Sequence, residues 1–222
     1  MIKLAKVPEP KVLVDNAAAW LQVVKDKLTA GEVPSETDKG RYRHADIKSA
    51  LIEETHGKCA YCEGYLMDVT FGDVEHISPK SLKVSDLFRW DNLTVACDRC
   101  NTGKSNVPDL VDPYVDDPDE YFLFAGSMVV PKPNNAKAKL TYDRLGLNRT
   151  GLLESRTRRI SNICRIVSLI DLSQDAFYRD VLVYDLFNNE LADASEFAAA
   201  ARSFIAWHFP HLRKAEYPSP GE

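Results

Sequence analysis

The fold of this chain is decided between Lys58 and Asn106, by the blocks KCAYCE (58–63), DVEHISPKS (73–81) and WDNLTVACDRCNTGKSN (90–106). Two Cys-x-x-Cys pairs enclose a glutamate that is followed directly by a histidine. Two asparagines accompany them. Cysteine, histidine, carboxylate and carboxamide side chains are the groups that hold metals and move protons. We therefore expect the chemistry of the protein to lie in this stretch.

The four cysteines of this stretch predict a metal site. Cys59 and Cys62 form the first pair, and Cys97 and Cys100 form the second. Each pair can turn tightly enough to present both sulfurs to one ion, and four thiolates close a tetrahedral shell that leaves no open position for catalysis. The spacing predicts a structural zinc ion that joins the two ends of the stretch. A redox dithiol would use a single pair.

The segment between the cysteine pairs predicts a strand, loop, strand and helix. Residues 74–77 and 93–96 have the composition of two short strands that can pair, and residues 98–106 can begin a helix. Adjacent residues of a strand point to opposite faces. Glu75 and His76 can therefore reach one site only if His76 lies where the first strand ends.

Composition and charge restrict the class of protein. The 222 residues are 45% hydrophobic and 27% charged, and no stretch of 18 apolar residues predicts a membrane span. The N-terminus has no apolar region typical of a secretory signal, so we expect a cytoplasmic protein whose paired cysteines bind metal. The net charge of -5 argues against strong binding of nucleic acid by the chain alone. A local basic patch or a partner would have to provide the binding to nucleic acid.

The remaining sequence predicts a mainly helical protein around this stretch. We divide the chain into an extended segment and helix (1–40), the metal-binding domain (41–110) and a mainly helical region that could dock a partner (111–222). Expected elements outside the central stretch are helices over 16–31, 46–56, 152–170, 173–188 and 195–209, a loop over 31–40, and a hairpin within 121–142. Four arginines on the long helix, Arg156, Arg158, Arg159 and Arg165, predict a solvated surface or, alternatively, a phosphate-facing or docking edge. The predicted fold class is α+β.

The central stretch resembles the HNH endonuclease family over residues 59–106. GDVEHISPKS, WDNL and CNTGKSN match the three motif blocks of that family. The resemblance implies a ββα-metal finger around one catalytic divalent ion, on a scaffold stapled by the four-cysteine zinc site. Carried over residue by residue, it makes His76 the general base, Glu75 and Asn101 the metal ligands, and Asn92 the residue that holds the loop and orients the histidine.

This sequence departs from the family pattern by having Glu75 and Asn101 where the family name expects histidines. Oxygen ligands suit a hard cation, so the substitutions favour Mg2+ or Mn2+. Lys104, just beyond Asn101, is placed to touch a neighbouring phosphate, with a plain surface lysine as the alternative. A neutral imidazole can take a proton from water near physiological pH, and the metal would stabilise charge on the phosphate and the departing oxygen.

The function implied by this resemblance is hydrolysis of phosphodiester bonds in nucleic acid, with DNA as the expected substrate and RNA left open. The alternative is a zinc module that binds nucleic acid or protein without catalysis. His76 separates the two hypotheses, because a pure binding finger has no use for a base beside a carboxylate.

A wider resemblance extends beyond the finger. KVPEP, CAYCE and LTYDRLGLNRTGLLESR look similar to HNH proteins that are encoded beside an AAA/ABC-type ATPase, as in Septu-type and retron-associated anti-phage defence. This resemblance implies that an ATPase subunit gates the nuclease and supplies the grip on nucleic acid. Restriction-type and homing-type HNH nucleases are the alternatives within the enzyme class.

Overall fold

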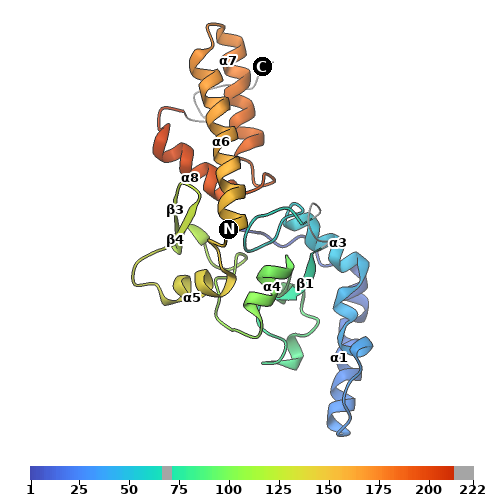
Figure 1. The fold of residues 1–222 in the computed structure, drawn as a ribbon. Coiled ribbons are helices and arrows are strands. Elements are labelled where there is room, and N and C mark those ends of the chain that lie inside the picture. The colour runs from blue at the N-terminus through green and yellow to red at the C-terminus, as the bar shows by residue number, and fades with distance from the viewer. Residues whose placement is uncertain (67–71, 213–222) are drawn as a thin grey trace.

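The computed structural model describes residues 1–66 and 72–212 (Figure 1). The helices and strands of these residues are α1 (Lys11–Thr29), α2 (Glu36–Lys39), α3 (Ala45–Glu54), β1 (Asp73–His76), β2 (Leu93–Ala96), α4 (Asp98–Lys104), β3 (Phe122–Ala125), β4 (Met128–Pro131), α5 (Ala136–Leu145), α6 (Thr150–Leu172), α7 (Ala176–Asp185) and α8 (Ala198–His208). Short 3-10 turns join several of them, among them η1 (Arg41–Arg43) before α3.

The predicted α+β finger is present. β1 and β2 pair in antiparallel fashion, with Asp73 opposite Ala96 and His76 opposite Leu93, and α4 follows β2 directly (Figure 1). β1 ends at His76, as a shared site for Glu75 and His76 requires. The second sheet of the described residues is the hairpin β3–β4, which confirms the hairpin predicted within 121–142.

The finger is buried in a core that is larger than the finger itself. Leu93 and Val95 of β2 are fully buried and belong to the same cluster as Leu13 of α1 and Ile47 and Leu51 of α3. Burying one such aliphatic side chain stabilises the fold by about 1.5–3 kcal/mol. The same cluster contains Leu145 of α5, so elements on both sides of the finger in the sequence fix its position.

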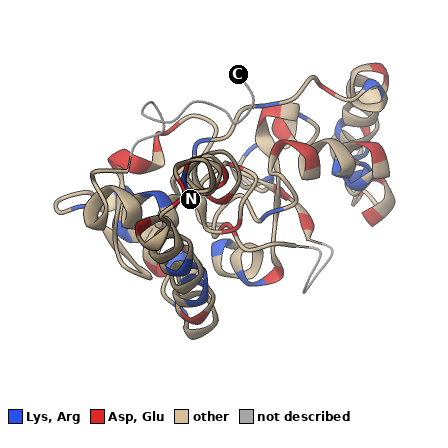
Figure 2. Cartoon of the chain, turned by 90° about the horizontal axis from the view of Figure 1, so that it is seen from above, with Lys and Arg blue, Asp and Glu red and all other residues tan. Residues whose placement is uncertain are grey.

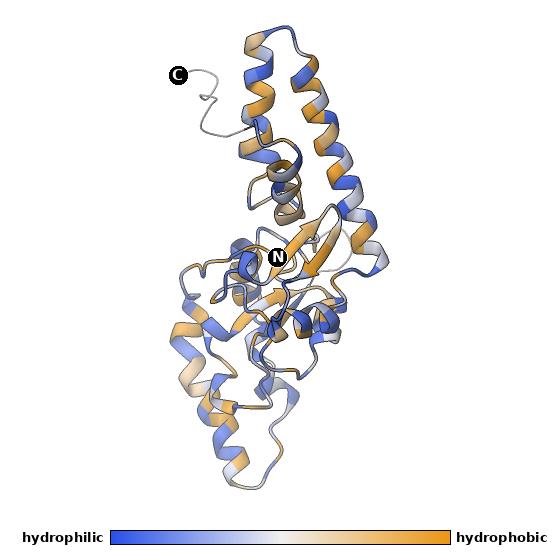
Figure 3. Cartoon of the chain, turned by 90° about the vertical axis from the view of Figure 1, so that its left-hand side faces the viewer, coloured by the Kyte–Doolittle hydropathy of each residue, from blue (hydrophilic) through white to orange (hydrophobic). Residues whose placement is uncertain are grey.

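A second apolar cluster holds the C-terminal helices together. It contains Ile163 and Val167 of α6, Val183 of α7 and Ile205 of α8. In Figure 1, α6 and α7 stand away from the finger as an antiparallel pair, with α8 crossing at their base. The hairpin β3–β4 packs against α8, and its strands stand out as hydrophobic in Figure 3.

Helix boundaries differ from the sequence-based expectation at the N-terminal side. α1 begins at Lys11, five residues before the predicted start at residue 16, because Pro10 precedes it. Proline is tolerated at the start of a helix, where its missing N–H would have had no partner. The segment predicted as a loop over 31–40 contains α2, whose first turn is closed by a capping box between Ser35 and Asp38.

The C-terminal side differs in two places. KLTYD, whose pattern fits a strand, lies in α5, where its apolar residues pack on the first core. The last helix begins at Ala198 instead of near Ser195. Cys164, the fifth cysteine of the chain, lies on helix α6 and is only partly buried.

The arginines of α6 do not form one solvated face. Arg156 is buried, its guanidinium lies over the ring of Phe197 at 5.6 Å, and Nη1 donates to the carbonyl oxygen of Ser127. Arg159 pairs with Glu190. Basic and acidic residues are interspersed along the helices in Figure 2. Among the described residues, no helix has the length and hydropathy needed to cross a membrane.

Candidate functional site

The four cysteines form a compact donor set. Their Sγ atoms all lie within 4.8 Å of one another, and those of Cys62 and Cys97 are 3.9 Å apart. A tetrahedral zinc ion with Zn–S bonds near 2.3 Å sets its sulfurs about 3.8 Å apart. Hydrogen bonds from Cys100 and Cys59 lower the pKa of Cys62 to about 7, toward the thiolate that metal binding needs. The cluster therefore fits one tetrahedrally bound metal ion.

His76 is held at the end of β1 as a neutral imidazole. The side chain is 3% exposed, its ring meets that of Tyr42 edge-on at 4.5 Å, and Nε2 lies 2.9 Å from the carbonyl oxygen of Leu87. A carbonyl oxygen can only accept, so Nε2 carries the proton and Nδ1 has a free lone pair. Burial lowers the pKa of His76 to about 4, which keeps the imidazole neutral at physiological pH.

Asn92 fastens the loop that begins after His76. Its Oδ1 accepts from the backbone N–H of Ser78 at 2.8 Å, and its Nδ2 donates to the carbonyl oxygens of Ser78 at 3.1 Å and of Asp86 at 3.3 Å. Leu87, the partner of His76, lies in the same loop. One buried carboxamide thus fixes both ends of the loop that orients the histidine.

Glu75 meets Lys104 of α4. Lys104 Nζ lies 2.9 Å from Glu75 Oε1, and the lysine side chain is fully buried. Burial raises the pKa of Glu75, and the charge of Lys104 opposes that rise. The expectation that Lys104 touches a phosphate from the surface is not met in this structure, and it is not a plain surface lysine either. Lys104 lies three residues beyond Asn101 on α4, and the helix directs the lysine side chain inward, onto β1.

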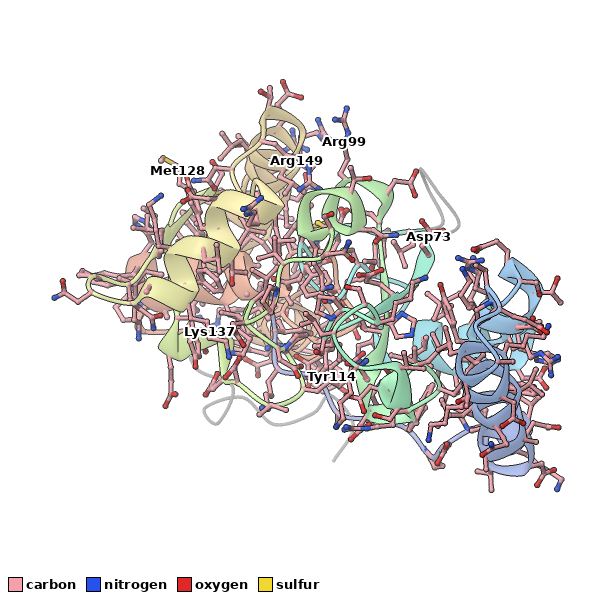
Figure 4. The ribbon with its side chains drawn as sticks, turned by 90° about the horizontal axis from the view of Figure 1, so that it is seen from below. Asp73, Arg99, Tyr114, Met128, Lys137 and Arg149 are labelled. Carbon is pink, nitrogen blue, oxygen red and sulfur yellow. The ribbon has the colours of Figure 1, made fainter. Side chains whose placement is uncertain are left out.

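Asn101 lies across from a carboxylate that the sequence analysis did not select. Asn101 Nδ2 donates to Asp73 Oδ2 at 3.2 Å. Asp73 stands two residues before Glu75 on β1, so the two carboxylates share one face of the strand. Figure 4 shows Asp73 on the strand beside α4. The alternation of a strand was the signal in the sequence that could have identified Asp73.

These side chains open into one cavity of about 380 Å³. The residues that line it include Asp73, Glu75, His76 and Asn101 from the finger, together with Tyr42, Arg43 and Lys80. Lys80 Nζ donates to the Tyr42 hydroxyl at 3.0 Å. The cavity therefore combines oxygen donors for a cation, a neutral imidazole, and positive charge that suits an anion.

Tyr42 and Arg43 come from η1, outside the segment to which the motifs belong. Neither residue could be selected from the sequence, because no local pattern indicates that this turn lies against β1. An arginine and a tyrosine just before a helix are common surface residues. The contact is visible only in three dimensions.

Comparison with known proteins agrees with this geometry. Residues 59–107 match the family described as HNH endonuclease. Septu protein PtuB of Bacillus thuringiensis is 35% identical over 108 residues, which are 46% of this chain and 41% of that protein. Septu protein PtuB of Bacillus mycoides (strain KBAB4) is 22% identical over 201 residues, 73% of this chain and 68% of that protein. The first alignment thus spans less than half of the relative that it matches.

Proposed function

Because residues 59–107 are an HNH domain and the chain is homologous to Septu protein PtuB, we propose that this protein is a metal-dependent endonuclease of an anti-phage defence system. One observation carries the proposal. His76, neutral and with Nε2 fixed on the Leu87 carbonyl, lines the same cavity as Glu75 and Asn101. A buried base beside oxygen donors has a use in hydrolysis and none in a structural knuckle.

The oxygen donors of the cavity suit a hard divalent cation. Glu75 and Asn101 would hold Mg2+ or Mn2+, with Asp73 as a further carboxylate on the same strand face. When bound, such an ion supplies positive charge that stabilises the phosphate and the departing oxygen. Four thiolates instead suit zinc, and a zinc ion on them would serve the fold.

The protein side chains then have distinct tasks. His76 takes a proton from water through Nδ1, because Nε2 already donates to a carbonyl. Lys104 holds the Glu75 carboxylate in place through a buried ion pair, and its charge opposes the rise that burial causes in the pKa of Glu75. Arg43 and Lys80, which also line the cavity, attract the phosphodiester, which carries a negative charge.

We further propose that a partner subunit supports nucleic-acid binding. The chain carries a net charge of -5, and its basic residues are interspersed with acidic ones (Figure 2). Strong binding to phosphate needs clustered positive charge. An AAA/ABC-type ATPase that docks on the helical region 111–222 would gate the nuclease, with DNA as the expected substrate.

Cleavage of supercoiled plasmid in Mg2+ or Mn2+ tests the nuclease. We expect cutting that disappears with His76→Ala and persists with His208→Ala, since His208 is an exposed histidine on α8 far from the finger in the sequence. A chelator serves as the metal-free control. Zinc is measured in every sample, because a chelator that removes the catalytic ion can also remove the structural one. Cys59→Ser should lose zinc and folding together.

The outcome of this assay separates the two hypotheses. If His76→Ala is as unstable as Cys59→Ser, the histidine is structural and the catalytic assignment is wrong. If the wild-type chain does not cleave the plasmid, the assay is repeated with the ATPase subunit and with RNA. Silence under those conditions as well would favour a zinc module that binds without cutting.

A further inference from the structure

A residue far outside the matched segment contacts the four-cysteine site. Arg149 places its guanidinium nitrogens 3.6–3.7 Å from the sulfurs of Cys62, Cys97 and Cys100. Its Nη1 also donates to the carbonyl oxygen of Leu145 at 2.9 Å. We propose that Arg149 neutralises the charge of the metal-loaded cysteine cluster and fastens helix α6 to it.

The charge of the cluster calls for such a partner. Four thiolates around one divalent ion carry two net negative charges, and three of these four cysteines are buried. Buried charge is costly unless it is paired and hydrogen-bonded. A guanidinium is always protonated and offers five N–H donors in a rigid plane, so one side chain can serve three sulfurs at once. Arg149 supplies both the positive charge and the donors.

The position of Arg149 is fixed from both sides. It occupies the extended residue just before α6, and its backbone N–H donates to the carbonyl oxygen of Gly146 at 2.9 Å. Gly146 is in the left-handed conformation that ends α5. The preceding Asn148 donates to the carbonyl oxygen of Val129 in β4. The guanidinium is therefore held at the sulfurs by a tight turn between α5 and α6.

Figure 4 shows how this arginine differs from another one at the same site. Arg149 lies beside α4, whereas Arg99, which stands between Cys97 and Cys100 in the sequence, points away into solvent. Arg99 is exposed. The two residues have the same charge and lie near the same metal site, but only Arg149 reaches the sulfurs in the described contacts. They form a matched pair for mutation.

The proposed contact links two parts of the fold. The cysteines and Leu152 in the first turn of α6 belong to the first core, whereas the rest of α6 packs with α7 in the second. If Arg149 is bound through its charge to the loaded cluster, metal removal should loosen the start of α6 as well as the finger. This inference does not depend on the nuclease proposal, because it concerns the metal site alone.

Zinc affinity is the first test. We expect Arg149→Gln to bind zinc 10- to 100-fold more weakly in competition with a chelator, the range typical for loss of an outer partner of a metal ligand. Arg149→Lys, which keeps the charge but not the planar donors, should lie in between. Arg99→Gln should stay within twofold of the wild type. A zinc affinity of Arg149→Gln within twofold of the wild type would overturn the proposal.

Cobalt substitution gives a second readout that ordinary destabilisation would not produce. N–H donation withdraws electron density from sulfur, so the sulfur-to-cobalt charge-transfer band of the Co2+-loaded protein should shift in Arg149→Gln and not in Arg99→Gln. An unshifted band in folded Arg149→Gln counts against the contact.

The wild-type protein supplies a third test if Arg149→Gln fails to fold. Hydrogen exchange is followed in residues 146–156 before and after zinc removal. Increased exchange in this segment supports the proposal, and unchanged protection while the finger itself opens refutes it.

Discussion

Replacing Asn92 by alanine should loosen the loop that orients the candidate base. The carboxamide is 6% exposed and makes three hydrogen bonds, two to the backbone of Ser78 and one to that of Asp86. A net value of about 1 kcal/mol for each bond, together with backbone groups left without a partner, gives a loss of about 2–4 kcal/mol. The substitution should lower the urea midpoint with little change in the dependence on denaturant.

The same substitution should reduce cleavage without changing the need for metal. Leu87, whose carbonyl holds His76 Nε2, lies inside the loop that Asn92 closes. Loss of the closure lets the imidazole turn, so the rate at saturating Mg2+ should fall while the half-saturating Mg2+ concentration stays the same. Asn101→Ala should instead raise that concentration, because Asn101 is a proposed ligand.

Asn92→Asp tests the same contacts by charge. It keeps the acceptor for the Ser78 N–H but turns a carboxylate oxygen toward the carbonyl oxygens of Ser78 and Asp86, so at neutral pH it should be no more stable than Asn92→Ala. A loss below about 1 kcal/mol in Asn92→Ala, with cleavage unaffected, would show that the loop is held by other contacts.

The pKa of His76 is near 6.5 in the unfolded chain and about 4 in the folded chain, because burial disfavours the protonated ring. The free energy of unfolding therefore has its full value above pH 6.5, and the part that depends on a neutral His76 is lost as the pH falls toward 4. The loss is about 3 kcal/mol. Urea unfolding without added Mg2+ should show it, and an equally steep pH dependence in His76→Gln would contradict it. A Cβ on Gly103 would lie 2.3 Å from the Arg144 carbonyl oxygen, so Gly103→Ala should push α4 from α5 and cost about 1–3 kcal/mol. Gly151→Ala, with open space around its Cβ, should not lower the melting temperature, and equal melting temperatures of the two variants would refute the packing argument.

The finger could be predicted from sequence because its signals are local. Cysteine spacing, two short strand patterns and the position of His76 before Ser78 all act within a few residues. Two more signals were present and were not used. Asp73 follows from strand alternation with Glu75, and the inward position of Lys104 follows from its spacing to Asn101 on a helix.

The rest of the site could not be predicted because it depends on contacts between distant segments. Tyr42 reaches His76 from a turn before α3, and Arg149 reaches the cysteines from a turn after α5. Neither residue carries a local mark of its role. An arginine in a polar turn is usually a solvated residue, and only the packing of α5 on α4 brings Arg149 to the sulfurs.

The shared first core has a consequence for transplanting this HNH finger into another protein. The apolar face that covers β2 comes from α3, which precedes the finger and packs in turn on α1, and the packing of α4 comes from α5, which follows the finger. An excised segment 59–107 would keep its motifs but present Leu93 and Val95 to water and invite self-association. A working graft therefore has to carry these three helices along, or be given a host whose surface reproduces their apolar faces.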